Sequence, residues 1–597
     1  MLLPRRWAAL LCGVGLLAVH GCNSGPPAGA GQASGKANQP VVERRNVSET
    51  WRVRSDTKSV SAEHGMVVSD APLATRVGVE VLRSGGSAVD AAVATAFALA
   101  VVWPTAGNIG GGGFAVLNVG GHTAALDFRE VAPAAARRDM YLDAGGTLTG
   151  KSVTGHLAAG VPGSVAGLWA LHEKHGTRPW RDLIQPAIDL ADNGFVVDSD
   201  YREQIGLELA RVRQFPATVR TFLPRGEVPA VGSRVSNPEL ARTLRAIQAS
   251  GPRGFYAGEI ADRLIAEMRR GGGIVTAADL ATYRPKWRTP MTFVYRNHTV
   301  TAMPLPSSGG ITVAMIAQQL DSYDLRNAGW HSPQAIHLQV EAMRRAFAVR
   351  NEQLGDPDFV TVDTQLLSST GFARKLASSI VVDRATPSLE VSGRVDVKPQ
   401  PKHTTHFSVT DTAGNAIALT TTLNSGFGSA VTVDGAGFIL NNEMDDFAVQ
   451  PGSSNQYGLV QGEANAIAPG KRMLSSMTPL IVAGSDGKPL LVTGASGGPL
   501  IITTVFQLMS NLLDYEMTVG ESMSAPRFHH QQLPDEISLE EGGFLPSTLA
   551  ELQRLGHKLT FFTVPTTGWT IAATIQRTPH GWEGKADPRL HGLAAGY

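Results

Sequence analysis

Two adjacent threonines, Thr404 and Thr405, lie between His403 and His406 in the stretch "PKHTTHFSVTDTAGNAIALTTTLN", residues 401–424. A threonine hydroxyl is a poor nucleophile, and it attacks a carbonyl group only when a base lies beside it. In a strand, Thr404 and His406 would face one side and Thr405 the other. Most such patterns are core strands. These residues alone therefore favour sheet packing and leave a covalent nucleophile as the alternative.

Several further residues could hold a small charged ligand, although each has an ordinary explanation as well. Arg129 in "DFRE" carries a guanidinium suited to bidentate contact with a carboxylate. Its acidic neighbours would equally explain it as half of a structural ion pair. Asp446 could be a turn acid, Ser475-Ser476 a loop pair, and Thr422 one of three strand threonines. Taken one at a time, none of them identifies a site.

Metal and phosphate motifs are weak in this sequence. His529 and His530 are adjacent, but no Glu or Cys stands at ligand spacing, which favours a structural role. The stretch "GNIGGGGFAVLN", residues 107–118, lacks the Lys-Ser/Thr ending of a phosphate loop and precedes a strand rather than a helix. Its glycines suit close approach of two backbones. We therefore predict no metal ion.

The elements that would position these residues begin with a short apolar strand near residue 65. It leads into a helix that ends in a Gly-Gly pair, and a buried alanine-rich helix follows over about 89–102. Two strands joined by a second Gly-Gly turn occupy about 107–130. Apolar periodicity predicts that residues 160–380 are mostly helical.

From residue 404 onward the pattern changes to strands. "TTHFSVTD" and "AIALTTTLN" flank a turn and predict a hairpin, and Asp434-Gly435 predicts a second turn. A long loop over 450–472 precedes a strand near 489–493 and the helix "LIITTVFQLMSNLLDY". Helices and strands occur in separate runs, which indicates a layered α+β or α/β domain.

Composition narrows the possible functions. The chain has 597 residues and a mass of 63.1 kDa, and 43% of its residues are hydrophobic. A sizeable packed core is expected. Lys+Arg and Asp+Glu both number 52, so the net charge is zero and no dense basic tract favours nucleic acid.

The N-terminus indicates export. Residues 1–22, "MLLPRRWAALLCGVGLLAVHGC", combine a basic start, an apolar run and a small residue before Cys22. They resemble a bacterial lipoprotein signal, in which Cys22 would carry lipid. Ordinary cleavage nearby, giving a free soluble protein, is the alternative, and the run is short for an uncleaved anchor.

A flexible tether is predicted over residues 23–57. Residues 23–40 contain no aromatic side chain and one charge, so they cannot bury enough surface to fold. Cys12 and Cys22 are the two cysteines of the chain, so the mature domain would have no internal disulfide and no thiol catalysis.

A dozen short stretches, taken in order, match one known family. They include "GNIGGGGFAVLN", "DFRE", "FYAGEIA", "PLPSSGG", "GDPDFV", "TTHFSVTDTAGNAIALTTTLN", "GFILNNEMDDFAVQPG", "KRMLSSMTP", "GASGGPLIITTV" and the final "AAGY". On these residues the chain resembles the γ-glutamyltransferases, or glutathione hydrolases, of the N-terminal nucleophile hydrolase class. The likeness runs from about residue 58 to 597.

The resemblance implies an α+β fold, a four-layer αββα sandwich. Members of the family are made as one precursor that cuts its own backbone before a threonine, here at His403–Thr404. A large subunit, residues 58–403, and a small subunit, residues 404–597, would then form one folded domain.

The resemblance also makes Thr404 the nucleophile. Cleavage would free its α-amine as the base, and an α-amine has a pKa of about 7.7–8.0, so a useful fraction is neutral at physiological pH. An N-terminal threonine thus carries nucleophile and base on one residue. Thr422, on the returning strand, resembles the second threonine that supports the nucleophile in this family.

Further roles carry over to a pocket for the γ-glutamyl group. The α-carboxylate would be held by Arg129, Ser475 and Ser476, and the α-ammonium by Asp446 with Glu443 and Asn424 assisting. Backbone N–H groups of Gly497 and Gly498 would stabilise the oxyanion, and Tyr457 would lie in a lid over the site.

The implied reaction transfers the γ-glutamyl group of glutathione to water or to an amino-acid or peptide acceptor. No cofactor is implied, and the expected location is periplasmic or outer-membrane-anchored in a bacterium. Three alternatives stay open: a cephalosporin (glutaryl) acylase, a poly-γ-glutamate transferase, and a surface lipoprotein that binds γ-glutamyl compounds without turnover. Asp446 argues against the acylase, because an α-ammonium needs an anionic partner and a glutaryl chain has no amine.

Overall fold

A computed structural model of the chain describes residues 56–392, 404–563 and 570–597. The predicted signal peptide with Cys22, nearly all of the tether, and His403 on one side of the predicted cleavage bond lie outside these residues. Thr404, on the other side of that bond, is described. Within the described part of the chain, no helix is both long and apolar enough to span a bilayer.

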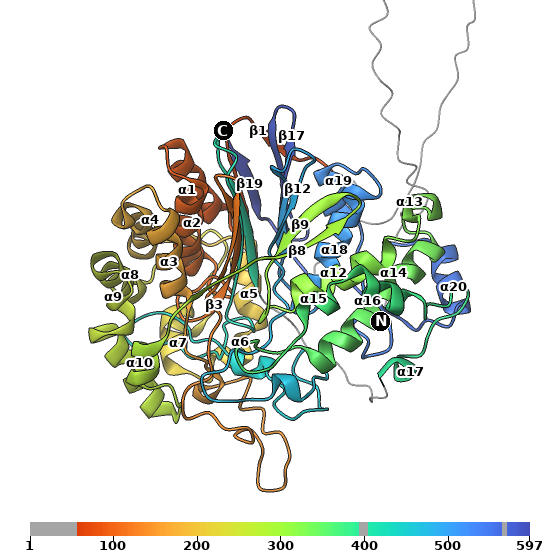
Figure 1. Ribbon diagram of the computed structural model, residues 1–597. Helices are drawn as coiled ribbons and strands as arrows, with labels where there is room; N and C mark the ends of the chain where they lie inside the picture. Colours follow the sequence, from red (N-terminus) through yellow and green to blue (C-terminus); the bar gives the residue numbers. More distant parts are fainter. Residues whose placement is uncertain (1–55, 393–403, 564–569) are drawn as a thin grey trace, which may run out of the picture. The chain divides into compact units, whose positions relative to one another are not determined.

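One antiparallel sheet carries the predicted hairpin at its centre (Figure 1). The hairpin is flanked on one side by an N-terminal strand and on the other by the glycine-rich strand. In spatial order the sheet consists of β19 (Leu593–Gly596), β2 (Met66–Ser69), β10 (Thr405–Thr410), β11 (Ala416–Thr422), β3 (Gly112–Val119), β4 (His122–Asp127) and β7 (Lys286–Arg288).

A second antiparallel sheet packs against the first, since β10 and β11 both contact β13. Its strands come mostly from the C-terminal third of the chain. In spatial order they are β1 (Val60–Ala62), β18 (Gly581–Ala586), β17 (Ala572–Thr578), β13 (Pro489–Ala495), β12 (Leu480–Ala483), β9 (His298–Ala302) and β8 (Met291–Tyr295). Two small sheets pair β5 (Phe195–Val196) with β6 (Arg234–Val235), and β14 (Phe528–His529) and β16 (Leu559–Phe562) with β15 (Ile537–Glu540).

Helices cover the outer face of each sheet, and Figure 1 shows them as two groups on either side of the strands. The first group contains α1 (Pro72–Arg83), α2 (Ala88–Val102), α3 (Ser164–His175), α4 (Trp180–Asn193), α5 (Ser199–Leu207), α6 (Leu209–Val212), α7 (Pro216–Phe222), α8 (Pro238–Ser250), α9 (Arg253–Tyr256), α10 (Gly258–Gly271) and α11 (Ala277–Thr282). The second contains α12 (Gly309–Leu320), α13 (Leu325–Ala328), α14 (Pro333–Gln353), α15 (Thr364–Leu367), α16 (Thr370–Ala377), α17 (Ser388–Ser392), α18 (Leu500–Leu513), α19 (Val519–Ser524) and α20 (Pro546–Arg554). The order helix, sheet, sheet, helix confirms the predicted four-layer αββα sandwich.

Helix α2 illustrates how local sequence builds a layer. All fifteen of its residues are buried, as expected for an apolar helix packed on both sides. Its N-terminus is fixed by a capping box in which Ser87 and Asp90 satisfy each other's backbone N–H groups. Asp90 also accepts a hydrogen bond from the backbone of Thr177 at 3.0 Å, so the one charged residue of the helix joins α2 to the loop before α4.

The glycines before β3 allow two backbones to meet. A Cβ atom on Gly111 would lie 2.1 Å from the carbonyl oxygen of Thr422, and one on Gly113 would lie 2.3 Å from that of Thr420. Neither distance is physically possible for a side chain. Glycine here therefore lets the start of β3 pack against the end of β11, as predicted, and holds Thr422 in place.

Candidate active site

The predicted nucleophile lies at the entrance of the central hairpin. Thr405 pairs with Thr421 across β10 and β11, and this register places Thr404 opposite Thr422. The two hydroxyl oxygens of Thr404 and Thr422 are 3.4 Å apart. The Thr422 oxygen also accepts a hydrogen bond of 2.7 Å from the backbone N–H of Asn424. The positions of both threonines agree with the prediction.

A pocket opens beside Thr404 and contains about 340 Å³ of space not filled by atoms, part of it open to solvent. Its lining comes from the end of β11, from α14 and α18, and from the segments between the main helices and strands. The predicted site residues among its lining are Arg129, Thr404, Thr422, Asn424, Glu443, Asp446, Tyr457, Ser475, Ser476 and Gly498. Residues far apart in sequence thus meet in one small volume, while the chemical roles assigned to them stay predictions.

Arg129 forms the charged floor of the pocket and is only 1% exposed. Its Nη1 lies 2.6 Å from a carboxylate oxygen of Glu443, and its Nη2 pairs with Asp446. The acidic neighbours in sequence matter less: Glu130 is 3.7 Å away, and Asp127 accepts a hydrogen bond from the Arg129 backbone N–H. The ion pairs of Arg129 are therefore made across the fold, with the two acids predicted to face the α-ammonium.

Three carboxyl groups share this one guanidinium; Glu130 and Glu443 are fully buried, and the Asp446 side chain is 13% exposed. Burial raises the pKa of Glu443 well above its ordinary value, although Arg129 opposes the shift. The pKa of Asp446 is raised for the same reason, and that of Glu130 is raised to about 8. For Arg129, burial alone would lower the pKa, but Glu443 and Asp446 more than offset it. The cluster thus holds more acid than it can neutralise.

The serine pair lines the same pocket, and both hydroxyls already accept hydrogen bonds. The Ser475 oxygen accepts from the backbone N–H of Met477 at 3.1 Å. The Ser476 oxygen accepts from Nη2 of Arg350 at 3.1 Å. Arg350 was not predicted as a site residue, although it lines the same pocket. The sequence feature that could have identified Arg350 is its position as a cation near the end of a buried helical segment.

Asn424 and Tyr457 close another side of the pocket. Asn424 has a positive φ of 78°, a conformation that asparagine tolerates better than most residues. The Tyr457 hydroxyl lies 2.9 Å from the Asn424 carbonyl oxygen and also contacts its side-chain oxygen. Tyr457 is 4% exposed, so in this structure the predicted lid residue is packed down onto the site.

Gly497 and Gly498 follow β13 and precede α18. Their φ angles are 116° and 57°, which L side chains rarely adopt. Within the described residues neither backbone N–H donates to another group of the chain. Gly498 lines the pocket, whereas Gly497 lies just behind it, where a Cβ would meet Thr570 at 2.9 Å. Only one of the two predicted oxyanion donors therefore faces the pocket directly.

The predicted structural role of the histidine pair agrees with its contacts. Nδ1 of His529 lies 2.8 Å from the Thr503 hydroxyl, and its Nε2 lies 2.9 Å from the Gln531 side chain. His530 is buried beside Asp535. His529 therefore joins α18 to the loop after β14, and His530 is held within that loop by Gln532 and Asp535.

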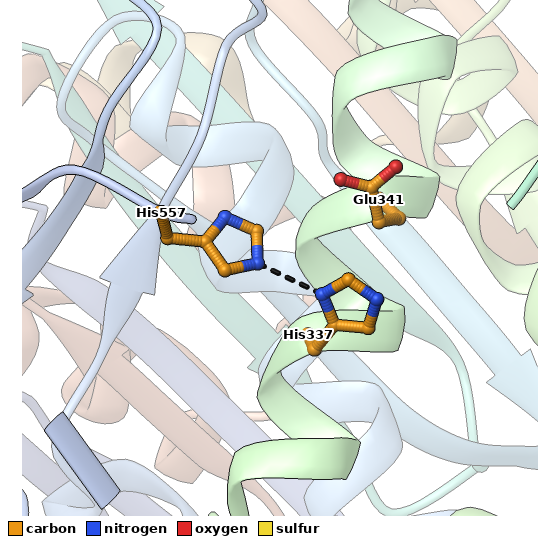
Figure 2. Close-up of side chains that lie close together, drawn as sticks. All are labelled: His337, Glu341 and His557. Carbon is orange, nitrogen blue, oxygen red and sulfur yellow. Dashed lines mark hydrogen bonds between the residues drawn. The ribbon is translucent and has the colours of Figure 1, made fainter. Parts of the chain in front are cut away.

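A separate group, His337, Glu341 and His557, is close enough to hold a metal ion (Figure 2). Nδ1 of His337 and Nε2 of His557 are already joined by a hydrogen bond of 2.8 Å. Glu341 pairs with both Arg344 and Arg345. A metal ion would have to displace the proton between the rings beside two guanidinium groups. This arrangement suits a structural polar cluster.

Comparison with known proteins places the whole folded part in one family. The family model described as gamma-glutamyltranspeptidase matches residues 74–597. The chain is 44% identical over 551 residues to a glutathione hydrolase proenzyme of Pseudomonas sp. (strain A14), covering 90% of this chain and 95% of that protein. It is 45% identical over 545 residues to the glutathione hydrolase proenzyme of Escherichia coli (strain K12), covering 90% and 93%.

Solved structures agree with this at the level of the fold. The Helicobacter pylori gamma-glutamyltranspeptidase is 40% identical with a TM-score of 0.54, covering 56% of this chain and 96% of the matched chain. A cephalosporin acylase from Bacillus halodurans superposes with a TM-score of 0.78 over 95% of this chain and 99% of that one, at 26% identity. The superposition on the acylase shows that the two proteins share an architecture. The family to which the chain belongs is shown by the sequence identities and the family model. The chain therefore belongs to the gamma-glutamyltranspeptidase family.

Proposed function

We propose that this chain is a self-processing γ-glutamyltransferase that hydrolyses glutathione and related γ-glutamyl amides through an ester on Thr404. The single observation that carries the proposal is the pocket in which Thr404 faces Arg129 and Asp446, a cation and an anion side by side. A γ-glutamyl group presents the complementary pair, an α-carboxylate and an α-ammonium. The names of the curated relatives support glutathione as the donor.

The chemistry needs only groups that this chain would carry after cleavage before Thr404. The free α-amine takes the proton of the Thr404 hydroxyl as Oγ attacks the γ-carbonyl carbon. The C–N bond of the amide then breaks, the departing amine receives that proton, and a γ-glutamyl ester remains on Thr404. Water, or the amine of an amino acid or peptide, attacks the ester and releases the γ-glutamyl product.

Substrate binding would exchange the partners of an existing ion pair. Arg129 gives up Asp446 and takes the α-carboxylate, which Ser475 and Ser476 also meet, while Asp446 takes the α-ammonium with Glu443 and Asn424. This exchange leaves no charge without a partner, which matters because an unpaired charge in a buried pocket is costly. The raised pKa values of the acids favour a ligand that brings a cation.

The oxyanion and the lid complete the proposal. As the carbonyl oxygen gains charge, the backbone N–H groups of Gly497 and Gly498 would donate to it, since neither has a partner within the described residues. Of the two, Gly498 lines the pocket. Tyr457 would move away from Asn424 to admit the donor and return to exclude water.

A second candidate is an acylase for glutaryl side chains, favoured by the acylase superposition. The acids of the pocket argue against it. A glutaryl donor brings a carboxylate and no ammonium, so Asp446 and Glu443 would face added negative charge in a buried site.

Export and anchoring are proposed from the N-terminal sequence. The apolar run and Cys22 support a lipoprotein signal that anchors the enzyme to a bacterial membrane, with residues 23–57 as the tether. The folded enzyme would then act in the periplasm or at the outer membrane. It would consist of a large subunit that ends at His403 and a small subunit that begins at Thr404.

Mass analysis and a donor assay test the proposal together. Purified protein should give two chains, the smaller beginning with Thr404, and should hydrolyse a γ-glutamyl anilide. A single uncut chain, or a cleaved protein without activity on this donor, would contradict it. An uncut chain that still binds γ-glutamyl compounds would favour the non-catalytic alternative.

A further inference from the structure

Arg350 is a second buried guanidinium in the pocket, and it differs from Arg129 in making no ion pair with a described residue. It lies near the end of α14 and is 1% exposed. Its acceptors are neutral: the Ser308 hydroxyl at 3.1 Å, the Gln461 side chain at 3.2 Å, and the oxygens of Asn351 and Ser476. Within the described residues no carboxylate lies within ion-pair distance of it.

The two arginines therefore create opposite electrostatic conditions. The Arg129 charge is already cancelled by Glu443 and Asp446, and Glu130 adds a further acid. An anion that approached Arg129 would first have to displace Glu443 or Asp446 from its guanidinium. Arg350 supplies positive charge on the side where the serine pair lies, and a buried cation without an anion gains from a ligand carboxylate.

We infer that Arg350 is a positioning and specificity residue that selects donors with an α-carboxylate, and this inference rests on the proposed γ-glutamyl function. It acts through Ser476. A hydroxyl has one proton to donate, and by donating to the Ser476 oxygen Arg350 directs that proton away from itself and toward a ligand. Met477 does the same for Ser475. The two serines thus become paired donors aimed at one carboxylate.

The second arm of Arg350 reaches the ammonium side of the pocket. Gln461, which accepts from Arg350 Nη1, donates through Nε2 to the backbone oxygen of Asp446 at 3.0 Å. Asn465 donates to the same oxygen at 2.7 Å. Because Asn465 holds this oxygen without Arg350, loss of the Arg350 guanidinium should act mainly on the serine pair.

Burial lowers the pKa of Arg350 to about 10, with Asp446 acting against the shift. The side chain stays protonated at neutral pH, so its charge is available to a substrate.

The test compares two chromogenic donors that differ only in the α-carboxylate. γ-Glutamyl anilide carries it, and 4-aminobutyryl anilide keeps the amine and chain length but lacks it. Arg350→Met should raise KM for the γ-glutamyl donor by about tenfold or more with a smaller change in kcat, and should change kcat/KM for the 4-aminobutyryl donor less than about twofold. Arg350→Lys keeps the charge but not the forked donor geometry of a guanidinium. Its preference between the two donors should therefore lie between those of wild type and Arg350→Met.

Arg345→Met is the matched control. Arg345 lies on the same helix, is 3% exposed, and pairs with Glu341 and the backbone of Ser379 away from the pocket. Its loss should reduce stability but leave the ratio of the two donors as in wild type. All proteins are first checked for complete cleavage, and their thermal unfolding is recorded.

Each result bears on one statement. The assignment of Arg350 is supported if Arg350→Met prefers γ-glutamyl over 4-aminobutyryl anilide less strongly than wild type does, while Arg345→Met keeps the wild-type preference. Equal losses on both donors, or an unaltered ratio, would overturn it while leaving the proposed function in place. If Arg350→Met does not fold, an Arg350→Lys variant with wild-type preference would also overturn it. Wild type that fails to use γ-glutamyl anilide would instead remove the proposed function.

Discussion

Two buried clusters of arginines and acids occur in this protein, and their charge balance is different. In the first, Arg589 pairs with Glu540 and Asp587, and Arg527 pairs with Asp587. Two cations meet two anions and all four side chains are buried, so we call this the closed cluster. This cluster joins β15 to the segment after β18.

The second cluster surrounds Arg129 and is open to the pocket. One guanidinium meets Glu130, Glu443 and Asp446, so one positive charge faces three acids. In the closed cluster, burial would raise the pKa of Asp587, but Arg527 and Arg589 more than offset this and hold it below its ordinary value. In the open cluster, burial prevails and the pKa values of the acids rise.

The contrast teaches how to distinguish structural from binding clusters. A structural cluster satisfies its own charges, because a buried charge without a partner costs several kcal/mol. A binding cluster is left incomplete and is balanced by its ligand. The acids around Arg129 outnumber its one positive charge, and Arg350 makes no ion pair with a described residue. Together the two groups are complementary to a zwitterion.

The largest expected effect is on the nucleophile beside the open cluster. Thr404→Ala should remain a single chain and lose activity by on the order of 10³-fold or more, since it removes the attacking oxygen. Gel analysis and the γ-glutamyl anilide assay measure both effects. Thr493→Val is the control: this buried strand threonine bonds to Thr574 at 2.8 Å and should be cleaved and active. Normal cleavage of Thr404→Ala would refute the processing mechanism.

The next largest effect is on stability, in the closed cluster. Asp587→Asn removes the anion that lies 2.7 Å from Arg527 and 3.0 Å from Arg589, and should cost about 3–5 kcal/mol of unfolding free energy. Because the pKa of Asp587 is depressed, its contribution is present above its unfolded pKa and is lost as the pH falls through the folded value. Denaturant unfolding at neutral and acidic pH measures both. A loss no larger than that of Asp446→Asn would remove the distinction between the clusters.

Asp446→Asn should change specificity more than stability. Wild type should prefer γ-glutamyl over glutaryl anilide, because the glutaryl chain leaves the acid without its ammonium. The variant should reduce that preference by about tenfold or more, because it binds γ-glutamyl anilide more weakly. Steady-state kinetics on fully cleaved proteins gives the ratio. Equal wild-type turnover of the two donors would withdraw Asp446 from ammonium binding and restore the acylase as a candidate.

The smallest expected effect, taken per pH unit, is a change in the slope of stability with pH at Glu130. Neither oxygen of its carboxyl group has a hydrogen-bond partner within the described residues, and burial raises its pKa from 4.5 to about 8. Between these values the folded state keeps a proton that the unfolded state has released, so the group lowers stability as the pH rises, by up to about 1.4 kcal/mol per pH unit. Glu130→Gln should remove this decline. Melting temperatures at pH 5 and pH 8 test it, and parallel curves for variant and wild type would contradict it.

The sequence alone was enough for the parts of the molecule that depend on local order. The alanine-rich helix, the hairpin of β10 and β11 and the crowded glycines before β3 follow from apolar periodicity, turn residues and the space a Cβ needs. Strand register then places Thr422 opposite Thr404 without further information. The family and the four-layer fold were also predicted, because many motifs in one order are specific where each alone is weak.

The charge partners were decided by the tertiary structure. Asp127 and Glu130 flank Arg129 in sequence, yet its two shortest ion pairs are made with Glu443 and Asp446, more than three hundred positions away. A strand end directs a side chain out of the sheet, and what it meets depends on which loop the stacked layers bring there.

Arg350 makes the same point more sharply. Arg344, Arg345 and Arg350 all lie on α14, but only the first two have an acid, Glu341, three or four residues before them. The first two turn toward Glu341 and form a closed pair of salt bridges, whereas Arg350 is directed at Ser476 and Gln461. Helical periodicity sets the direction of each side chain. The packing of α14 against the long loop after β11 determines which arginine remains available to a substrate.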